Sequence, residues 1–297
     1  APESCDGLDD DCDTQVDNPP DADGDGFNVC DGDCDDEDPS PCVAVQVSSG
    51  SLHTCVLLQT GAVRCWGLGH SGRLGLGSTD SLGDEEPAVD GGDIELGGPV
   101  QQIAAGGNYT CALLVDGTAR CFGEAEYGQL GQGTVEDIGD DELPTAVPAI
   151  DLGTQIVSLA AAGSNVCALL DDGTVRCWGR GYYGGLGTGS AEDVGDDEVA
   201  DEGLPVPLGG DAVEVVAGLA HFCALLDTGA VHCWGYNDAG QLGYGHTDNI
   251  GDDEPASAAG PVSLGSGSVV ELAAGTLHTC ALYSAGTVRC WGQGAVG

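Results

Sequence analysis

Clusters of aspartate near the N-terminus are the residues of this sequence best suited to chemistry, and that chemistry is the binding of a hard cation. Carboxylates recur at alternate positions in CDGLDDDCDTQVD (5–17), and in DADGDG (21–26) the third acid is followed by glycine. Alternate carboxylates on a tight loop converge on one Ca²⁺, which takes oxygen ligands. Residues 1–42 therefore predict calcium sites built from Asp9, Asp11, Asp13, Asp17, Asp21, Asp23, Asp25, Asp31, Asp33, Asp35, Asp36 and Asp38.

This aspartate-rich segment is not an EF-hand, because Gly32 stands where the glutamate at the twelfth loop position would be. Copper is disfavoured, since copper prefers imidazole and sulfur ligands and the segment contains no histidine. The alternative to a calcium site is an acidic linker without a fixed structure.

A second set of carboxylates recurs at a spacing of 56 residues, in LGDEE (82–86), IGDDE (138–142), VGDDE (194–198) and IGDDE (250–254). Acids on a loop that begins with glycine again favour calcium. The alternative is a solvated loop that keeps the protein soluble, and repetition does not separate the two because duplicated units share their loops. The predicted ligands are Asp84, Glu86, Asp140, Glu142, Asp196, Glu198, Asp252 and Glu254.

Cysteines recur in five copies of one 14-residue segment: TCVLLQTGAVRCWG (54–67), TCALLVDGTARCFG (110–123), VCALLDDGTVRCWG (166–179), FCALLDTGAVHCWG (222–235) and TCALYSAGTVRCWG (279–292). Two apolar runs around a glycine turn predict a β-hairpin, which places its two cysteines opposite one another. Zinc is disfavoured, because the spacing is not CxxC and no histidine is adjacent in the pattern of a zinc site. We expect disulfides Cys55–Cys65, Cys111–Cys121, Cys167–Cys177, Cys223–Cys233 and Cys280–Cys290.

Composition indicates an oxidising, extracellular or bacterial cell-surface location. The chain has 15 cysteines, no methionine and a formal net charge of −44, which disfavours nucleic acid and anionic membranes as partners. No stretch has the length and apolarity of a membrane span.

Without an initiator methionine, Ala1 is expected to be a processed or truncated start. No nucleophile elbow, P-loop or HExxH motif occurs, so we expect no enzyme activity.

The chain divides into two regions near Cys42. Residues 1–42 have few large apolar side chains and need disulfides or metal to fold, whereas residues 43–297 have the apolar content of an all-β protein. In the second region each hairpin is preceded by a short apolar strand and followed by a glycine-rich loop such as GYYGGLGTG (181–189).

The strand AAG, the hairpin CALLxxGxVxCWG and the loop GQLGxG together resemble the regulator of chromosome condensation repeat, over about 255 residues. The resemblance implies a β-propeller with one four-stranded blade per repeat, commonly seven blades, and is nearest to a bacterial secreted branch of the family. It also implies that Trp66, Phe122, Trp178, Trp234 and Trp291 pack the blades. Only five hairpins are present, and the last lacks its final strand, so the chain is expected to expose a strand edge or to continue.

Residues 1–42 resemble an Asp- and Cys-rich putative metal-binding motif similar to thrombospondin type-3 repeats. In tandem arrays of that motif a further element precedes PESCDG, so the odd number of cysteines, Cys5, Cys12, Cys30, Cys34 and Cys42, indicates either a fragment or an intermolecular disulfide.

These patterns lead to one functional expectation and two alternatives. The expectation is a secreted or cell-surface, calcium-stabilised structural or adhesive protein that binds itself, as an extracellular fibre, or binds a protein or glycan surface. The first alternative is a secreted binding module or enzyme inhibitor, because the bacterial branch includes an inhibitor of β-lactamase. The second, nucleotide exchange on a small GTPase, is disfavoured by the disulfides.

Overall fold

The computed structural model describes residues 43–294, which form five antiparallel three-stranded sheets, here called blades 1 to 5. Within each blade the strands follow one another in chain order. The strands are β1 Ala44–Ser49, β2 His53–Leu58, β3 Val63–Gly67, β4 Val100–Ala105, β5 Tyr109–Leu114, β6 Ala119–Gly123, β7 Ile156–Ala161, β8 Asn165–Leu170, β9 Val175–Gly179, β10 Ala212–Ala217, β11 His221–Leu226, β12 Val231–Gly235, β13 Val269–Gly275, β14 His278–Tyr283 and β15 Val288–Gly292.

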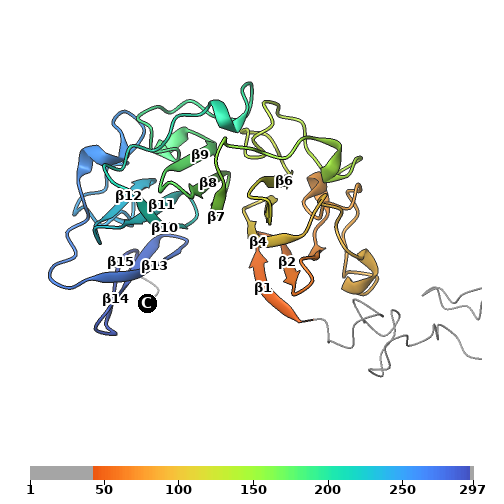
Figure 1. Ribbon diagram of the computed structural model, residues 1–297, viewed down its shortest axis with the longest axis horizontal. Helices are drawn as coiled ribbons and strands as arrows, with labels where there is room; N and C mark the ends of the chain where they lie inside the picture. Colours follow the sequence, from red (N-terminus) through yellow and green to blue (C-terminus); the bar gives the residue numbers. More distant parts are fainter. Residues whose placement is uncertain (1–42, 295–297) are drawn as a thin grey trace, which may run out of the picture.

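The blades follow one another along an arc with the first strand of each blade on the inner side (Figure 1). The ends of these inner strands line one hollow, to which each blade contributes one stretch of three residues: 49–51, 105–107, 161–163, 217–219 and 274–276. The arc is open between blade 1 and blade 5 (Figure 1). The expected all-β propeller repeat is therefore confirmed in outline, and no closed ring is formed by residues 43–294.

The expectation of a fourth strand in each blade is wrong. After the third strand the chain returns to it only at isolated residue pairs, first in the antiparallel bridges Gly67–Leu82, Gly123–Ile138, Gly179–Val194 and Gly235–Ile250. The residue after each of these bridges is a glycine with positive φ, for example +94° at Gly139, and this left-handed conformation turns the chain away from the sheet. In blades 2 and 3 the chain meets the third strand once more, in the isolated bridges Ala119–Ile150 and Arg176–Pro205, and residues 43–294 form no continuous fourth strand.

The hairpins form as the sequence predicts, and the structure joins all five cysteine pairs. The two strands pair in register so that Cys111 lies opposite Cys121, with their Cα atoms 4.0 Å apart, and the other four pairs have the same arrangement. Glycine at the turn, such as Gly117 at φ +85°, permits the tight reversal.

Aromatic side chains hold neighbouring blades together, as expected. Phe122, Trp178 and Trp234 are fully buried, and Trp66 and Trp291 are half-buried. The indole of Trp178 also donates a hydrogen bond of 3.1 Å to the carbonyl of Gln129 in the glycine-rich loop of the preceding blade. Trp234 and Trp291 donate equivalent bonds to Gly185 and Gln241, so blades 3, 4 and 5 are each fixed to the preceding blade by apolar burial and by a directional contact.

Short 3₁₀ turns complete the described structure: η2 His70–Gly72, η3 Ala88–Gly91, η4 Pro144–Ala146, η5 Tyr182–Gly184, η6 Ala200–Glu202 and η7 Ala256–Ala259. None of the helical segments described is long and apolar enough to cross a membrane. The boundary between residues 42 and 43 stays a prediction, because the segment before it lies outside the described residues.

Candidate functional site

The glycine-rich loop of each blade packs directly on the acidic loop of the next blade. At the boundary between blades 3 and 4, the Gly189 amide donates to the carbonyl of Gly251 at 3.0 Å. A Cβ placed on Gly184 would lie 2.5 Å from the carbonyl oxygen of Ile250 and 2.6 Å from the Asp252 nitrogen. Only glycine permits so close a backbone approach, so these glycines position the acidic loops.

The same contact repeats between the earlier blades. The amide of Gly133 donates to Gly195 at 3.0 Å, and that of Ser78 donates to Gly139 at 3.2 Å. The first acidic loop, residues 82–86, has no such partner among residues 43–294, and a Cβ on Gly83 would meet nothing within 4 Å.

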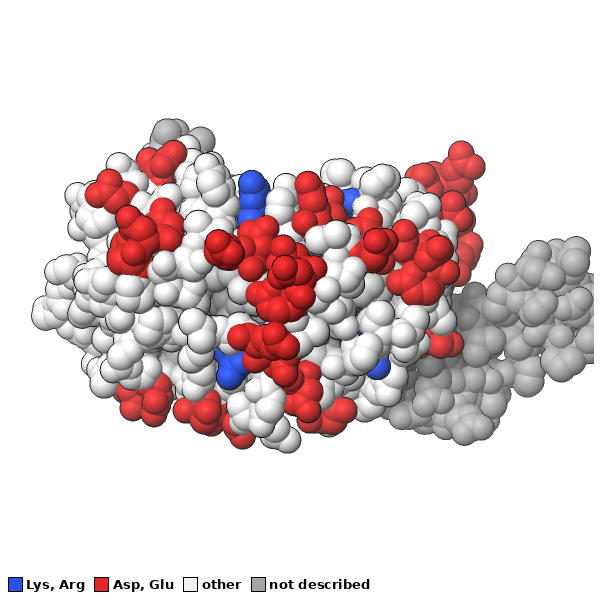
Figure 2. Space-filling model, turned by 90° about the horizontal axis from the view of Figure 1, so that it is seen from above, with Lys and Arg blue, Asp and Glu red and all other residues white. Residues whose placement is uncertain are grey.

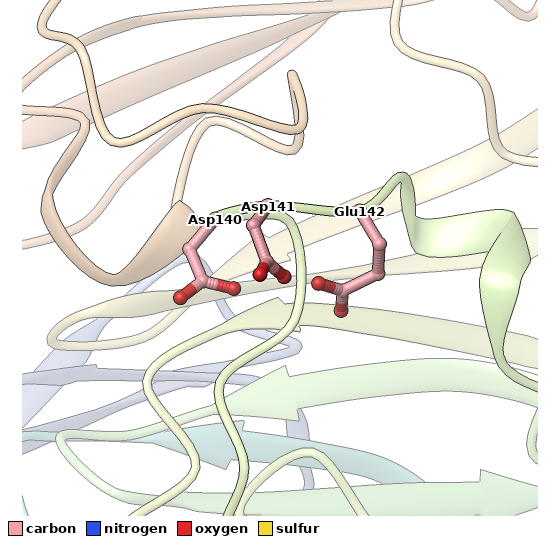
Figure 3. A group of neighbouring side chains, drawn as sticks. All are labelled: Asp140, Asp141 and Glu142. Carbon is pink, nitrogen blue, oxygen red and sulfur yellow. The ribbon is translucent and has the colours of Figure 1, made fainter.

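This packing decides where carboxylates gather. Asp140, Asp141 and Glu142 each bring a ligand atom within 4.8 Å of the others, and their carboxylates lie side by side next to the preceding blade's loop (Figure 3). Equivalent clusters form at Asp196–Glu198 and Asp252–Glu254. We call these three groups the acidic clusters.

The acidic clusters include six of the calcium ligands expected in the repeats, together with one additional aspartate in each cluster, which the sequence prediction omitted. Asp84 and Glu86 do not form such a group within the described part of the chain. Asp84 is exposed, whereas Asp140 is half-buried beneath the neighbouring loop. The remaining predicted ligands lie outside the described residues: Asp9, Asp11, Asp13, Asp17, Asp21, Asp23, Asp25, Asp31, Asp33, Asp35, Asp36 and Asp38.

Crowding within the acidic clusters raises the pKa of the glutamate in each. Partial burial is the largest cause for Glu142, Glu198 and Glu254, followed by a hydrogen bond with the preceding aspartate and repulsion from nearby carboxylates. The pKa of Glu254 is raised to about 7. Each of these glutamates is therefore more stable when it carries a proton, or when an external cation neutralises the negative charge around it.

Little positive charge offsets these carboxylates. Asp and Glu are spread in several groups over the side of the molecule seen in Figure 2, the convex side of the arc, and few Lys or Arg are visible there. The chain has 6 basic Lys and Arg residues against 50 acidic ones. Most arginines are engaged within the fold: Arg64 pairs with Asp93 at 2.5 Å, and Arg176 donates to the carbonyl of Gly203 at 3.1 Å. The convex side therefore attracts cationic partners.

A group of tyrosines around one arginine, here called the tyrosine patch, lies on the glycine-rich loops of blades 2 to 4. The guanidinium carbon of Arg180 is 4.5 Å from the ring centroid of Tyr127 and 5.3 Å from that of Tyr182. Tyr183 extends the group, with its ring centroid 4.1 Å from that of Tyr182 and 4.9 Å from that of Tyr236. The sequence analysis missed this patch, because Tyr127 lies 56 residues before Tyr183 and Tyr236 lies 53 residues after it, and only blade packing brings them together.

The buried histidines join blades. His53 hydrogen bonds with Thr110 at 2.8 Å and His221 with Thr279 at 3.0 Å, each across a blade boundary. Burial is the main cause that lowers the pKa of both histidines to about 4. Both histidines are uncharged at neutral pH and join neighbouring blades in the interior, and neither is placed to transfer protons to solvent.

Comparison with known proteins supports the same architecture. The profile described as "Regulator of chromosome condensation (RCC1) repeat" matches residues 44–73, 100–129, 156–184, 212–241 and 269–297, and a second profile of this repeat matches residues 60–113 and 228–282. Together they match more than half of the chain. The crystal structure of human WBSCR16 superposes with a TM-score of 0.65 at 25% identity, covering 82% of this chain and 59% of that one.

Two relatives at 31% identity over 255 residues are human "E3 ubiquitin-protein ligase HERC2" and "Ultraviolet-B receptor UVR8" of Arabidopsis thaliana. The aligned region covers 84% of this chain and 5% of HERC2, and 85% of this chain and 54% of UVR8. The chain therefore spans only part of the relatives that it matches.

These relatives overturn the expected function. A ligase and a receptor are regulatory proteins, so the expectation of a calcium-stabilised structural or adhesive fibre is wrong. The matched repeats form the propeller blades described above, and HERC2 as a whole is named a ligase. The narrower resemblances, to a bacterial secreted branch and to thrombospondin type-3 repeats, stay predictions. The fold, the two repeat profiles and these relatives show that the chain belongs to the regulator of chromosome condensation (RCC1) repeat family.

Proposed function

We propose that this propeller is a protein-binding module whose acidic clusters recognise a basic segment of a partner protein. The observation that carries the proposal is the placement of the clusters: the same three-carboxylate group recurs in blades 2, 3 and 4 and is held by packing. No ion pair within residues 43–294 neutralises any of the three groups. Membership in a family that includes a ubiquitin ligase and a receptor supports a binding role.

Electrostatics favours a basic protein segment over other ligands for these clusters. A net charge of −44 repels nucleic acid and accelerates the encounter with cationic surfaces. Burial is the main cause that raises the pKa of Glu254, and repulsion from Asp252 and Asp253 adds to it. A basic side chain at the cluster would offset that repulsion.

The experiment measures binding of a fluorescent lysine- and arginine-rich peptide by anisotropy at several salt concentrations. Neutralising Asp140, Asp141 and Glu142 to Asn and Gln, together with the equivalent residues of the other two clusters, should weaken binding at least tenfold and flatten its salt dependence. The matched control neutralises the first acidic loop at Asp84, Glu85 and Glu86, which does not form a cluster. It is compared with a variant neutralised only at Asp140, Asp141 and Glu142, so that both variants lose three carboxylates. Equal losses in both variants would refute a role for the clusters.

Calcium binding stays a prediction for the same loops and for residues 1–42. Each acidic cluster offers carboxylate oxygens suited to a hard cation, and a bound ion would lower the pKa of its glutamate. Isothermal titration of the chain with Ca²⁺, compared with the variant neutralised at the three clusters, measures how much heat these loops contribute. Identical titration curves for the two proteins would show that the three clusters do not bind Ca²⁺.

We further propose that the chain works in an oxidising compartment, outside the cell or on its surface. Five cysteine pairs at bonding distance support this, because such bonds persist where thiols are not kept reduced. Mass spectrometry of a non-reduced digest of the native protein should find each cysteine linked to its partner ten residues away. Free thiols at these positions would contradict the proposed location.

A further inference from the structure

The tyrosine patch concentrates a scarce residue type at one place. The chain has 7 tyrosines and only 5% aromatic residues, yet four of the tyrosines and Arg180 lie in contact across three blades. Tyrosine and arginine are the residues enriched at the energetic centres of protein interfaces.

Packing does not account for the exposed part of the patch. Tyr182 is 53% exposed and Tyr183 is 38% exposed. Tyr183 also adopts φ +62°, a left-handed conformation that a bulky side chain rarely takes. The equivalent residue in blade 1 is Ser71, which has φ +60° and is buried. The fold therefore accepts a small side chain at this position, and blade 3 instead holds a solvent-exposed ring there.

The patch already shows which kind of group it accepts. Arg180 lies over the rings of Tyr127 and Tyr182 at cation–π distances. The adjoining pair, Tyr183 and Tyr236, has no cation over it among the contacts of the described residues. Its rings are positioned for a second guanidinium supplied from outside.

Acidic groups border these rings. Gly184 follows Tyr183 and is in backbone contact with Asp252, the first residue of the blade 4 acidic cluster. On the other side, the Tyr236 hydroxyl donates to Asp238 at 2.8 Å, and Asp238 is exposed. A cationic side chain over Tyr183 and Tyr236 would therefore have the Asp238 carboxylate next to Tyr236, and the backbone beside Tyr183 adjoins the blade 4 acidic cluster.

We propose that the tyrosine patch binds an arginine side chain of the partner's basic segment, stacking its guanidinium on Tyr183 and Tyr236 beside the blade 4 acidic cluster. The proposal rests on the proposed function and makes it more specific, since the acidic clusters supply charge attraction while the rings select arginine over lysine. A planar, weakly hydrated guanidinium stacks on aromatic faces, whereas an ammonium remains strongly hydrated.

The test compares two labelled peptides of equal length and charge, one with arginine and one with lysine as its basic residue, on the full chain. The unmodified protein should bind the arginine peptide about two- to fivefold more tightly than the lysine peptide. Tyr183→Ser, which copies the residue of blade 1, should remove this preference. Tyr183→Phe keeps the ring and should retain it, which separates ring stacking from a change in loop structure.

Val213→Ser is the matched control, because Val213 on β10 is an exposed apolar side chain, at 55%, outside the glycine-rich loops. It should leave the preference unchanged. Absence of an arginine preference in the unmodified protein, or its persistence in Tyr183→Ser, would overturn the proposal. Either result would leave the proposed function intact, provided that neutralising the acidic clusters still weakens the binding of both peptides. Failure of that neutralisation to affect either peptide would refute the proposed function itself.

Discussion

Removing the disulfide of blade 3 should cost more stability than removing the disulfide of blade 5, although the two close loops of the same length. Both pairs are separated by 10 residues, so the loop-closure entropy that each bond removes from the unfolded chain is equal. Their surroundings differ: Cys167 and Cys177 are 0% and 2% exposed, whereas Cys290 is solvent-exposed and Cys280 is half-buried.

The magnitude follows from two contributions. A loop of this length gives an entropic contribution of about 3 kcal/mol. Replacing both cysteines of blade 3 by alanine also deletes two buried sulfur atoms, at about 1 kcal/mol each, by analogy with the loss of a buried methylene group. We expect a total loss of about 5 kcal/mol for Cys167→Ala with Cys177→Ala, and about 3 kcal/mol for Cys280→Ala with Cys290→Ala.

Hydrogen exchange measured by mass spectrometry suits a repeat protein, because it reports the opening free energy of each blade separately. A loss of about 3 kcal/mol corresponds to a fall in amide protection of roughly 150-fold, and each further 1.4 kcal/mol to another factor of about ten. The amides of β8 and β9 report on blade 3, and those of β14 and β15 on blade 5. Equal losses in the two blades would refute the packing contribution. Unchanged protection in blade 5 would refute the entropic one.

Three further predictions concern glycine, glutamate and histidine positions. Gly184→Ala should lower the melting temperature more than Gly240→Ala. The two glycines have nearly the same φ, +77° and +76°, but only at Gly184 would the new Cβ collide, 2.5 Å from the Ile250 carbonyl oxygen. Gly240→Ala should therefore cost only the backbone strain of about 1 kcal/mol, and equal shifts in melting temperature would argue against the close packing of the loops. The raised pKa of Glu254, about 7 against 4.5, means that the folded chain holds a proton that the unfolded chain has lost, so in calcium-free buffer this group's contribution to stability should fall as pH rises from 4.5 to 7. Glu254→Gln should abolish that part of the pH dependence in urea unfolding, and an unchanged slope would contradict it. The lowered pKa of His221, about 4 against 6.5, has the opposite sign, because the unfolded chain binds the proton first: stability present above pH 6.5 should be lost as pH falls towards 4. Hydrogen exchange should rise first in β11 and β14, and also in β2 and β5, which His53 joins with the same lowered pKa. His221→Asn should remove the effect in β11 and β14 alone. Uniform acid sensitivity across all blades would contradict that localisation.

The sequence alone determined the features that depend on local pattern and covalent chemistry. Two apolar runs around a glycine turn specify a hairpin, and cysteines ten residues apart on such a hairpin are brought opposite one another by strand register. Five copies of that unit indicated a repeat architecture, because repeated units with one apolar face are stabilised by stacking on their neighbours. The resemblance to the regulator of chromosome condensation repeat then implied a propeller, with Trp178 packed inside a blade.

Only the tertiary structure decided which loops form sites. The acidic loops LGDEE (82–86) and IGDDE (138–142) have nearly the same sequence, yet the carboxylates form a cluster at Asp140 and not at Asp84. The reason is that Gly72 of the preceding blade packs against the second loop, whereas no described blade precedes the first. The tyrosine patch has the same origin, since Tyr127, Tyr183 and Tyr236 stand on three loops that approach one another only across blade boundaries. Contacts between residues about 56 positions apart depend on the angle and spacing of packed sheets, and these are set by side-chain packing over the whole blade rather than by any local pattern.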